Sequence, residues 1–246
     1  MADARLVHDL EMAALNSVPV PRQRLVGGFL LRAFHGGTGR GNAACALHPH
    51  PDPRLAARVS DIAAHYRGQG LPPRIRSTPL DPFDLASHLV ATGWRSMDET
   101  LVLAGPLRAV AREEATAWWL DGPAEEWMAV VATAEHQGPA RRREKLEGAE
   151  LMAIPCAWLV LDGAASIFVT ADGPLCGIFD LAVRPEARRQ GLARRAIGAA
   201  AAWGLARGCD TLWAQVGVAN AASLALNAGL GLSEVYRYQY YLLDKG

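Results

Sequence analysis

The chain has few cysteines, no excess of either charge and no long apolar segment. Its 246 residues include 25 lysines and arginines and 25 aspartates and glutamates, so the formal net charge at neutral pH is zero. A chain without net charge offers no overall electrostatic attraction to nucleic acid or to an anionic membrane surface. We therefore expect neither as a partner, and we expect any cationic cluster to serve a local purpose.

The four cysteines lie far apart and form no C-x-x-C pair; they are Cys45, Cys156, Cys176 and Cys209. This pattern favours small buried side chains in a reducing cytosol over disulfides. The N-terminal segment carries Asp3, Asp9 and Glu11 and has no apolar core, which argues against a signal peptide. The longest apolar helix expected, Ala196–Ala206, is too short to span a bilayer. Together these features predict a cytoplasmic protein.

Predicted strands alternate with predicted helices along the chain, which indicates an α/β sheet with some parallel pairing. The pattern of apolar residues resets near residue 106, and we expect two domains, 1–106 and 107–246. In the second domain, the dipeptide Asp162–Gly163 predicts a tight turn between two strands. Beyond it, the spacing predicts a strand at Gly177–Val183, a helix at Gln190–Arg207 and a strand at Thr211–Val216.

In the segment "FDLAVRPEARRQGLARRAI", five arginines follow Asp180, and Glu186 is the single acid among them. Pro185 ends the strand, and Gly191 stands at the mouth of the next helix, whose first N–H groups have no intrahelical acceptor. Such donors, the helix dipole and the arginines Arg188 and Arg189 together predict a site for a diphosphate. The alternative is a solvated Arg-rich helix start, but cations at a helix N-terminus are unfavourable without a nearby anion. The segment lacks the lysine of a P-loop, which disfavours a nucleotide-binding protein.

At these residues the sequence resembles the GNAT superfamily, the Gcn5-related N-acetyltransferases. The family signature [Q/R]-x-x-G-x-[G/A] stands here as Arg188-Arg189-Gln190-Gly191-Leu192-Ala193. A second family segment follows in order, as Asn220-x-x-Ser223, then Leu226, then Gly231-Leu232. The resemblance covers residues 153–243 well and is weaker over residues 111–150.

The resemblance implies a mixed, mostly antiparallel sheet of the α+β type with two central parallel strands splayed apart, the acyl-CoA N-acyltransferase fold. It implies transfer of an acetyl group from acetyl-CoA to a primary amine of a small molecule or peptide. We expect no metal, because His48 and His50 have no matching Cys or second His pair. A backbone N–H in the gap between the splayed strands is then expected to polarise the thioester carbonyl. The cofactor-binding residues implied are Leu181, Ala182, Val183, Arg188, Arg189, Gln190, Gly191, Leu192, Ala193, Asn220 and Ser223.

The catalytic residues are less clear, because Asn227 stands where the family commonly has a tyrosine that acts as the acid. Tyr236 and Tyr238 alternate on one face of the last strand with Tyr240, and these tyrosines are the candidates for the acid. A purely structural role is the alternative, since tyrosines suit half-buried strands. Asp180 is the expected base, since a carboxylate within an apolar strand is costly unless it is used or paired. A paired structural Asp180 stays an alternative, and Asn227 keeps open a non-catalytic acyl-CoA sensor or interaction module.

The first half resembles a degenerate copy of the second half. Pro49 and Gly93 are separated by 44 positions, and Pro185 and Gly231 by 46, which suggests a tandem duplication. Prolines replace the N–H donors in "PHPDPRLAA", so we expect this copy to bind no acetyl-CoA but to complete a joint sheet or to wall the acceptor site. An unrelated α/β cap is the alternative. The sequence leaves open whether the protein forms a homodimer.

Overall fold

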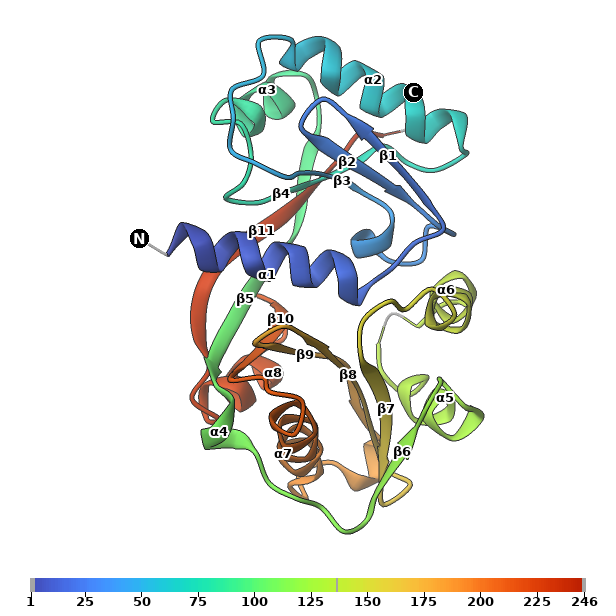
Figure 1. The fold of residues 1–246 in the computed structure, drawn as a ribbon. Helices are drawn as coiled ribbons and strands as arrows, with labels where there is room; N and C mark the ends of the chain where they lie inside the picture. Colours follow the sequence, from blue (N-terminus) through green and yellow to red (C-terminus); the bar gives the residue numbers. More distant parts are fainter. Residues whose placement is uncertain (1–2, 136, 245–246) are drawn as a thin grey trace.

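The computed structural model describes residues 3–135 and 137–244 (Figure 1). In this part of the chain, eleven strands form one mixed sheet in the order β1-β2-β3-β4-β11-β5-β10-β9-β8-β7-β6. Most neighbouring strands are antiparallel, and the pairs β3–β4 and β9–β10 are parallel. The expected α/β fold of the α+β type, with a mostly antiparallel sheet, is therefore confirmed.

The first half of the chain contains α1 (Ala4–Ser17), β1 (Arg22–Val26), β2 (Phe29–Ala33), the 3-10 helix η1 (Gly39–Gly41), β3 (Ala44–Ala46), α2 (Leu55–Gly68), β4 (Arg74–Ser77), α3 (Leu85–Ala91) and β5 (Arg95–Pro106). The second half contains α4 (Leu107–Val110), β6 (Ala117–Leu120), α5 (Glu125–Val131), α6 (Pro139–Ala149), β7 (Cys156–Leu161), β8 (Ala165–Asp172), β9 (Leu175–Val183), the 3-10 helix η2 (Pro185–Ala187), α7 (Leu192–Leu205), β10 (Thr211–Gly217), α8 (Ala221–Ala228) and β11 (Ser233–Leu242).

The two halves exchange their last strands. Strand β5 pairs with β10, and strand β11 pairs with β4, while β5 and β11 pair with each other at the centre of the sheet. Figure 1 shows these two long strands running side by side from one half to the other. The sheet is thus continuous across residue 106, as expected for a first half that completes a joint sheet.

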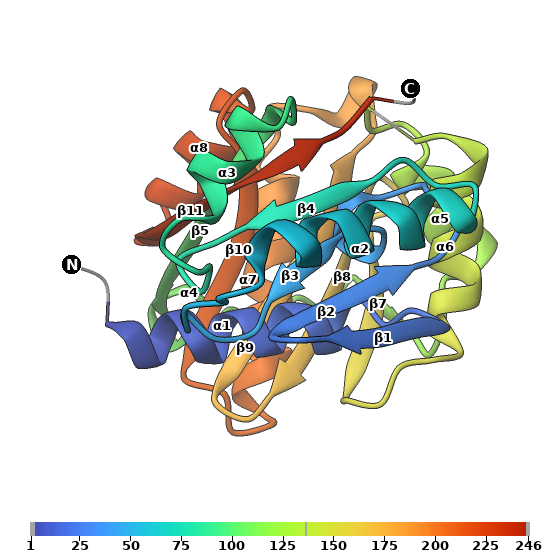
Figure 2. The same ribbon diagram turned by 90° about the horizontal axis from the view of Figure 1, so that it is seen from above.

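The element order supports the duplication. The series β3-α2-β4-α3-β5 in the first half matches β9-α7-β10-α8-β11 in the second, and each series begins with a parallel pair of strands. Figure 2, seen from above, shows α2 and α3 on the part of the sheet that contains β4. The division into domains at residue 106 stays a prediction.

Helix α1 is an element that the sequence analysis did not assign. It buries Val7, Leu10 and Ala14 against the sheet, and it lies across the middle of the molecule (Figure 1). Its Glu11 is almost fully buried, and both carboxylate oxygens accept hydrogen bonds from the guanidinium of Arg76 on β4. This ion pair removes the cost of burying Glu11, whose charge obscured the apolar face of the helix in the sequence.

Three apolar clusters cover the faces of the sheet. One lies under α7, a second lies under α1 and α5 on the opposite face, and a third lies under α2 and α3. Tyr236, Tyr238 and Tyr240 belong to the second cluster and Tyr241 to the third, which confirms that they alternate along β11. Among the described helices, none is long and apolar enough to cross a membrane.

The predicted turn at Asp162–Gly163 is confirmed. Asp162 and Gly163 have positive φ angles of 52° and 63°, and the N–H of Ala164 donates to the carbonyl of Leu161. Two successive residues with positive φ form the tight turn whose twist matches that of the flanking strands. This hairpin joins β7 to β8.

Candidate active site

Strands β9 and β10 are paired at one end and separate at the other. Their parallel pairing joins Leu175–Ile178 to Thr211–Ala214 and stops there, although β9 continues to Val183 and β10 to Gly217. The splayed pair expected from the sequence is therefore present. The last residues of β9 leave their backbone groups on this side without a strand partner, so an extended ligand can lie between the two strands.

A bulge in β9 lies beside this gap. Phe179 pairs with Phe168 and Ala182 with Ser166, so one extra residue stands on β9, where Asp180 has a φ of +50°. Phe179 and Ala182 both contact the cluster under α1 and α5, whereas Leu181 packs against the cluster under α7. Strict alternation would direct Asp180 toward the apolar helix α7, and the bulge instead directs it toward α6.

The turn Arg188–Ala193 joins β9 to α7 in a conformation suited to anions. Gly191 is the N-cap of α7 with a φ of +82°, and Arg189 has a φ of +64°. Left-handed residues in such a turn direct successive N–H groups into one concavity, and the first turn of α7 adds donors without intrahelical acceptors. A Cβ placed on Gly191 would meet no atom within 4 Å, so the space before the helix is open. These residues fit a diphosphate.

The five arginines near this turn have different surroundings. Arg195 forms ion pairs with Glu114 and Asp162, at 2.8 and 2.7 Å. Arg184 and Arg194 donate to the carbonyls of Gly163 and Gly229. Arg188 is exposed and donates to the carbonyl of Val183, at the end of β9. Arg189 is also exposed. Because Arg188 and Arg189 lie within the turn itself, they are the arginines of this group placed to attract a phosphate there.

Asn220 and Ser223 have a capping role. Asn220 is the N-cap of α8, and its side-chain oxygen accepts a hydrogen bond of 3.0 Å from the N–H of Ser223. This contact satisfies one of the free donors at the helix start. Asn227, in the same helix, is buried and donates its side-chain N–H to the carbonyl of Ser223. Contact of Asn220 or Ser223 with a cofactor stays a prediction.

The two candidate tyrosines occupy different environments. Tyr238 donates a hydrogen bond of 3.2 Å to the side-chain oxygen of Gln215, which directly follows the last residue of β10 paired with β9. Tyr236 instead donates to the carboxylate of Glu11, and burial together with that carboxylate raises the pKa of Tyr236. The hydroxyl of Tyr238 therefore lies by the gap between the strands, whereas that of Tyr236 is held in a buried network.

Asp180 is paired with cations from α6. Its carboxylate forms an ion pair with Lys145 and lies 3.9 Å from the guanidinium of Arg141. Burial acts to raise the pKa of Asp180, but the charges of Lys145, Arg40 and Arg141 and the hydrogen bond from Lys145 together outweigh it, so the pKa lies below its usual value. Asp180 is thus an ionised carboxylate, in the arrangement of the paired structural acid. Its role as the base stays a prediction.

A small cavity of about 90 Å³ adjoins the bulge. Its apolar walls include Trp127, Trp158, Phe168 and Phe179. Its charged lining comprises Arg40, Arg141, Glu144, Lys145 and Asp180. Figure 1 shows α5 and α6 on the opposite side of β7–β9 from α7, so this cavity and the diphosphate turn are reached from different faces.

Arg40, Arg141 and Lys145 were not among the site residues predicted from the sequence. Arg141 and Lys145 are four residues apart and share one face of the helix, and this spacing was the available signal. Among the described residues, no group of three or more His, Cys, Asp or Glu side chains could hold a metal ion.

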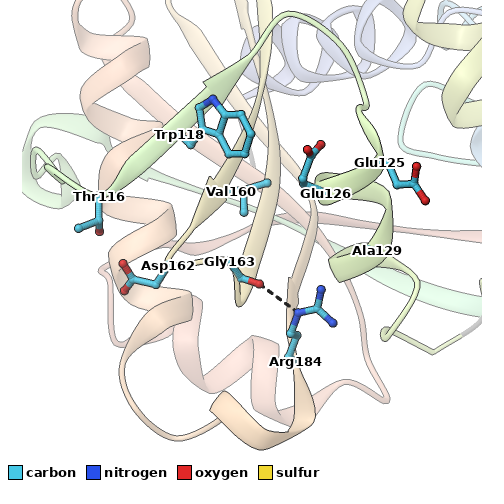
Figure 3. Close-up of a pocket in the computed structure, with 9 residues that line it drawn as sticks. All are labelled: Thr116, Trp118, Glu125, Glu126, Ala129, Val160, Asp162, Gly163 and Arg184. Carbon is cyan, nitrogen blue, oxygen red and sulfur yellow. Dashed lines mark hydrogen bonds between the residues drawn. The ribbon is translucent and has the colours of Figure 1, made fainter.

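A larger and more open depression of about 570 Å³ lies between β6, α5 and the β7–β8 turn (Figure 3). Trp118 forms part of its wall, and Arg184 crosses its edge to reach the carbonyl of Gly163. The splayed ends of β9 and β10 and the cavity beside Asp180 contribute no other lining residue to this depression. It is therefore separate from the candidate active site.

The corresponding turn of the first half is filled by the protein itself. A carboxylate oxygen of Asp52 accepts a hydrogen bond of 2.9 Å from the N–H of Arg54 at the start of α2, and the other oxygen pairs with Arg58. Asp52 thus supplies the negative charge that a phosphate would supply at the second turn. This contact supports the expectation that the first half binds no acetyl-CoA.

Comparison with known proteins gives consistent results. Residues 5–241 match the family model described as "Probable histone acetyltransferase Rv0428c C-terminal". The chain is 24% identical over 250 residues to "Uncharacterized N-acetyltransferase YobR" of Bacillus subtilis, covering 95% of this chain and 97% of that protein.

Solved structures share the fold over most of the chain. A GCN5-related N-acetyltransferase from Kribbella flavida has a TM-score of 0.68 and 18% identity, covering 98% of this chain and 96% of that one. A tandem GNAT protein from the clavulanic acid biosynthesis pathway has a TM-score of 0.63 and 15% identity, covering 96% and 88%. The resemblance to the GNAT superfamily is thus confirmed, in a tandem form. The chain belongs to the family described as "Probable histone acetyltransferase Rv0428c C-terminal", and it has the GNAT fold.

Proposed function

We propose that the protein is an acetyl-CoA-dependent N-acetyltransferase that acts on a primary amine of a small molecule or peptide. The single observation that carries this proposal is the open turn at Gly191 at the end of a strand that separates from its parallel neighbour. The turn offers donors for a diphosphate, and the gap leaves an unpaired strand edge for the pantetheine arm. Residues 107–246 form the catalytic domain in this proposal, and residues 1–106 form the degenerate copy.

Acetyl-CoA, when bound, supplies an acetyl thioester whose carbonyl carbon accepts the amine nitrogen. In this proposal the N–H groups of Arg189–Ala193 and the side chains of Arg188 and Arg189 hold its diphosphate. The backbone of Leu181–Val183 orients the arm, and an N–H of this segment polarises the thioester carbonyl. Helix α7 and its apolar cluster fix the position of β9 relative to the turn.

The reaction requires two proton transfers, one from the amine and one to the thiolate. The attacking amine loses a proton as the C–N bond forms, and the departing thiolate gains a proton as the C–S bond breaks. We assign the acid role to Tyr238, whose hydroxyl lies beside Gln215 at the gap. Asp180 is the candidate acceptor of the amine proton, directly or through water, and its ionised state is compatible with that role.

A non-catalytic acyl-CoA sensor is the second candidate, because Asn227 replaces the usual tyrosine and its side chain is buried within α8. The two candidates differ in thiol release. Incubation of the full chain with acetyl-CoA and a set of amines, amino acids and peptide N-termini should release free CoA in proportion to acetylated amine. Binding of acetyl-CoA without release of free CoA in the presence of any of these amines would favour the sensor.

A further inference from the structure

The cavity beside Asp180 has an excess of positive charge. Three cations line it, Arg40, Arg141 and Lys145, against the two carboxylates of Asp180 and Glu144. Lys145 pairs with Asp180, so that pair is locally neutral. The remaining guanidinium groups face a single carboxylate, and a charge in a partly enclosed site is costly unless an opposite charge accompanies it.

Neither arginine donates a side-chain hydrogen bond to a carboxylate within the described residues. Arg141 is 3.9 Å from the nearest oxygen of Asp180, which is beyond hydrogen-bond distance. Arg40 is half-buried and lies over the ring of Phe179, 5.7 Å from its centre. Within residues 3–135 and 137–244, its guanidinium has no hydrogen-bond or ion-pair partner. Two guanidinium groups with free donors therefore border the same cavity, and this is the arrangement that binds oxyanions in a bidentate manner.

Glu144 forms no hydrogen bond with either arginine, although its charge acts on Arg141. One of its oxygens accepts hydrogen bonds from the N–H groups of His35 and Gly37 and from the side chain of Asn42, at 2.8 to 3.0 Å. This carboxylate is therefore committed to holding the loop that carries Arg40. Its second oxygen is buried and has no partner among the described residues, although the side chain lines the cavity and is only 6% exposed. A ligand that carries an N–H donor can satisfy it.

The cavity lies where an acceptor would approach, and this step rests on the proposed function. It adjoins Asp180 on the α6 side of β9, whereas the turn at Gly191 leads into α7 on the other side. The phosphates of acetyl-CoA are assigned to that turn, so they are not the partners of Arg40 and Arg141. A volume of about 90 Å³ accommodates a small polar head group, since one water in the liquid occupies roughly 30 Å³.

We propose that the acetyl acceptor is a small amine that also carries an anionic oxyacid group, a carboxylate or a phosphate. Arg40 and Arg141 bind the anionic group, and the aromatic walls enclose the carbon chain. Lys145 is the positioning residue, because its ion pair with Asp180 holds that carboxylate at the cavity.

The test compares matched amines that differ only in the anionic group: β-alanine against propylamine, and phosphoethanolamine against ethanolamine. Quenching of tryptophan fluorescence reports binding, because Trp127 and Trp158 line the cavity. Each anionic amine that serves as a ligand should bind at least about tenfold more tightly than its neutral partner, as expected for charge-assisted hydrogen bonds. The anionic amine that binds more tightly shows whether the oxyacid group is a carboxylate or a phosphate.

Variants test which residues are responsible. Arg40→Gln and Arg141→Gln should each weaken binding of the anionic amine by about tenfold to a hundredfold, with little change for the neutral amine. Arg142→Gln is the matched control, since Arg142 is the next residue of α6 and its side chain is exposed. The proposal is overturned if neither anionic amine binds, if neutral amines bind equally well, or if the control variant weakens binding as much as the other two.

Calorimetry with acetyl-CoA separates this proposal from the proposed function. Arginine-dependent binding of anionic amines by a protein that does not bind acetyl-CoA would contradict the proposed function and retain the anion site. Suppose instead that the protein binds acetyl-CoA and releases free CoA only when neutral amines are the acceptors. This result would retain the proposed function and overturn the anion site.

Discussion

Tyr238 on β11 donates a hydrogen bond to Gln215 on β10, directly beyond the point where β10 separates from β9. Strand β5 lies between β10 and β11 in the sheet, so this contact crosses over the central strand that comes from the first half of the chain. The exchange of strands thus places a hydroxyl at the gap. We propose this hydroxyl as the acid, because α8 carries Asn227 in place of the usual tyrosine.

Replacement of Tyr238 by phenylalanine should lower kcat by about tenfold to a hundredfold, because the thiolate then leaves without a proton donor. The KM for acetyl-CoA should change little, since the hydroxyl is not part of the diphosphate turn. Tyr241→Phe is the control, because Tyr241 faces the third cluster on the other side of the sheet. A Tyr238→Phe variant with unchanged kcat would exclude Tyr238 as the acid.

Breaking the buried ion pair between Glu11 and Arg76 should strongly destabilise the protein. Both side chains are at least 94% buried, and replacement of Glu11 by alanine leaves the charge of Arg76 without compensation. We expect a loss of about 3–5 kcal/mol in the free energy of unfolding, measured by urea denaturation. The double variant Glu11→Leu with Arg76→Met should recover most of this loss. A loss below about 1 kcal/mol in the single variant would contradict this role.

Asp81 should make stability depend on pH. Burial raises the pKa of its carboxyl from 3.8 to about 7, although hydrogen bonds from Ser77 and Thr78 act in the opposite direction. The folded state then holds the proton more tightly than the unfolded state. The stabilisation is complete below about pH 4 and is lost as the pH rises through about 7.

Asp81→Asn removes this titrating group while keeping a side-chain oxygen as an acceptor. Relative to the original protein, the variant should gain stability as the pH rises from about 4 to about 8, by at most about 1.4 kcal/mol per pH unit. Urea denaturation at several pH values measures the difference. A difference between the two proteins that does not vary with pH would contradict the raised pKa.

Local features of the site could be predicted from the sequence, and long-range features could not. Pro185 and Gly191 mark the end of one element and the start of the next, so the turn followed from residue chemistry alone. The exchange of β5 and β11 depends on pairing between residues more than a hundred positions apart, such as Tyr236 with Val102, and no local pattern specifies it. The bulge at Asp180 depends on the register between the neighbouring strands β8 and β9, which the alternation of residues does not specify either.

The ion-pair partners of charged residues could not be predicted from the sequence either. Lys145 lies in a helix that reads as polar, and its ion pair with Asp180 appears only when α6 packs beside the bulge. Glu11 similarly has the sequence pattern of a surface charge, and its partner Arg76 lies on β4, far away in the sequence. A buried ion pair removes the apolar pattern on which sequence prediction depends.

Titration of the full chain with acetyl-CoA in a calorimeter tests the central claim most directly, with Gly191→Glu as the variant. Gly208→Glu is the matched control, because Gly208 has a φ of +83° and open surroundings like Gly191 and lies just beyond the opposite end of α7. We predict saturable micromolar binding by the original protein and the control, and none by Gly191→Glu. Absence of heat with the folded original protein, or equal binding by Gly191→Glu, would contradict the account.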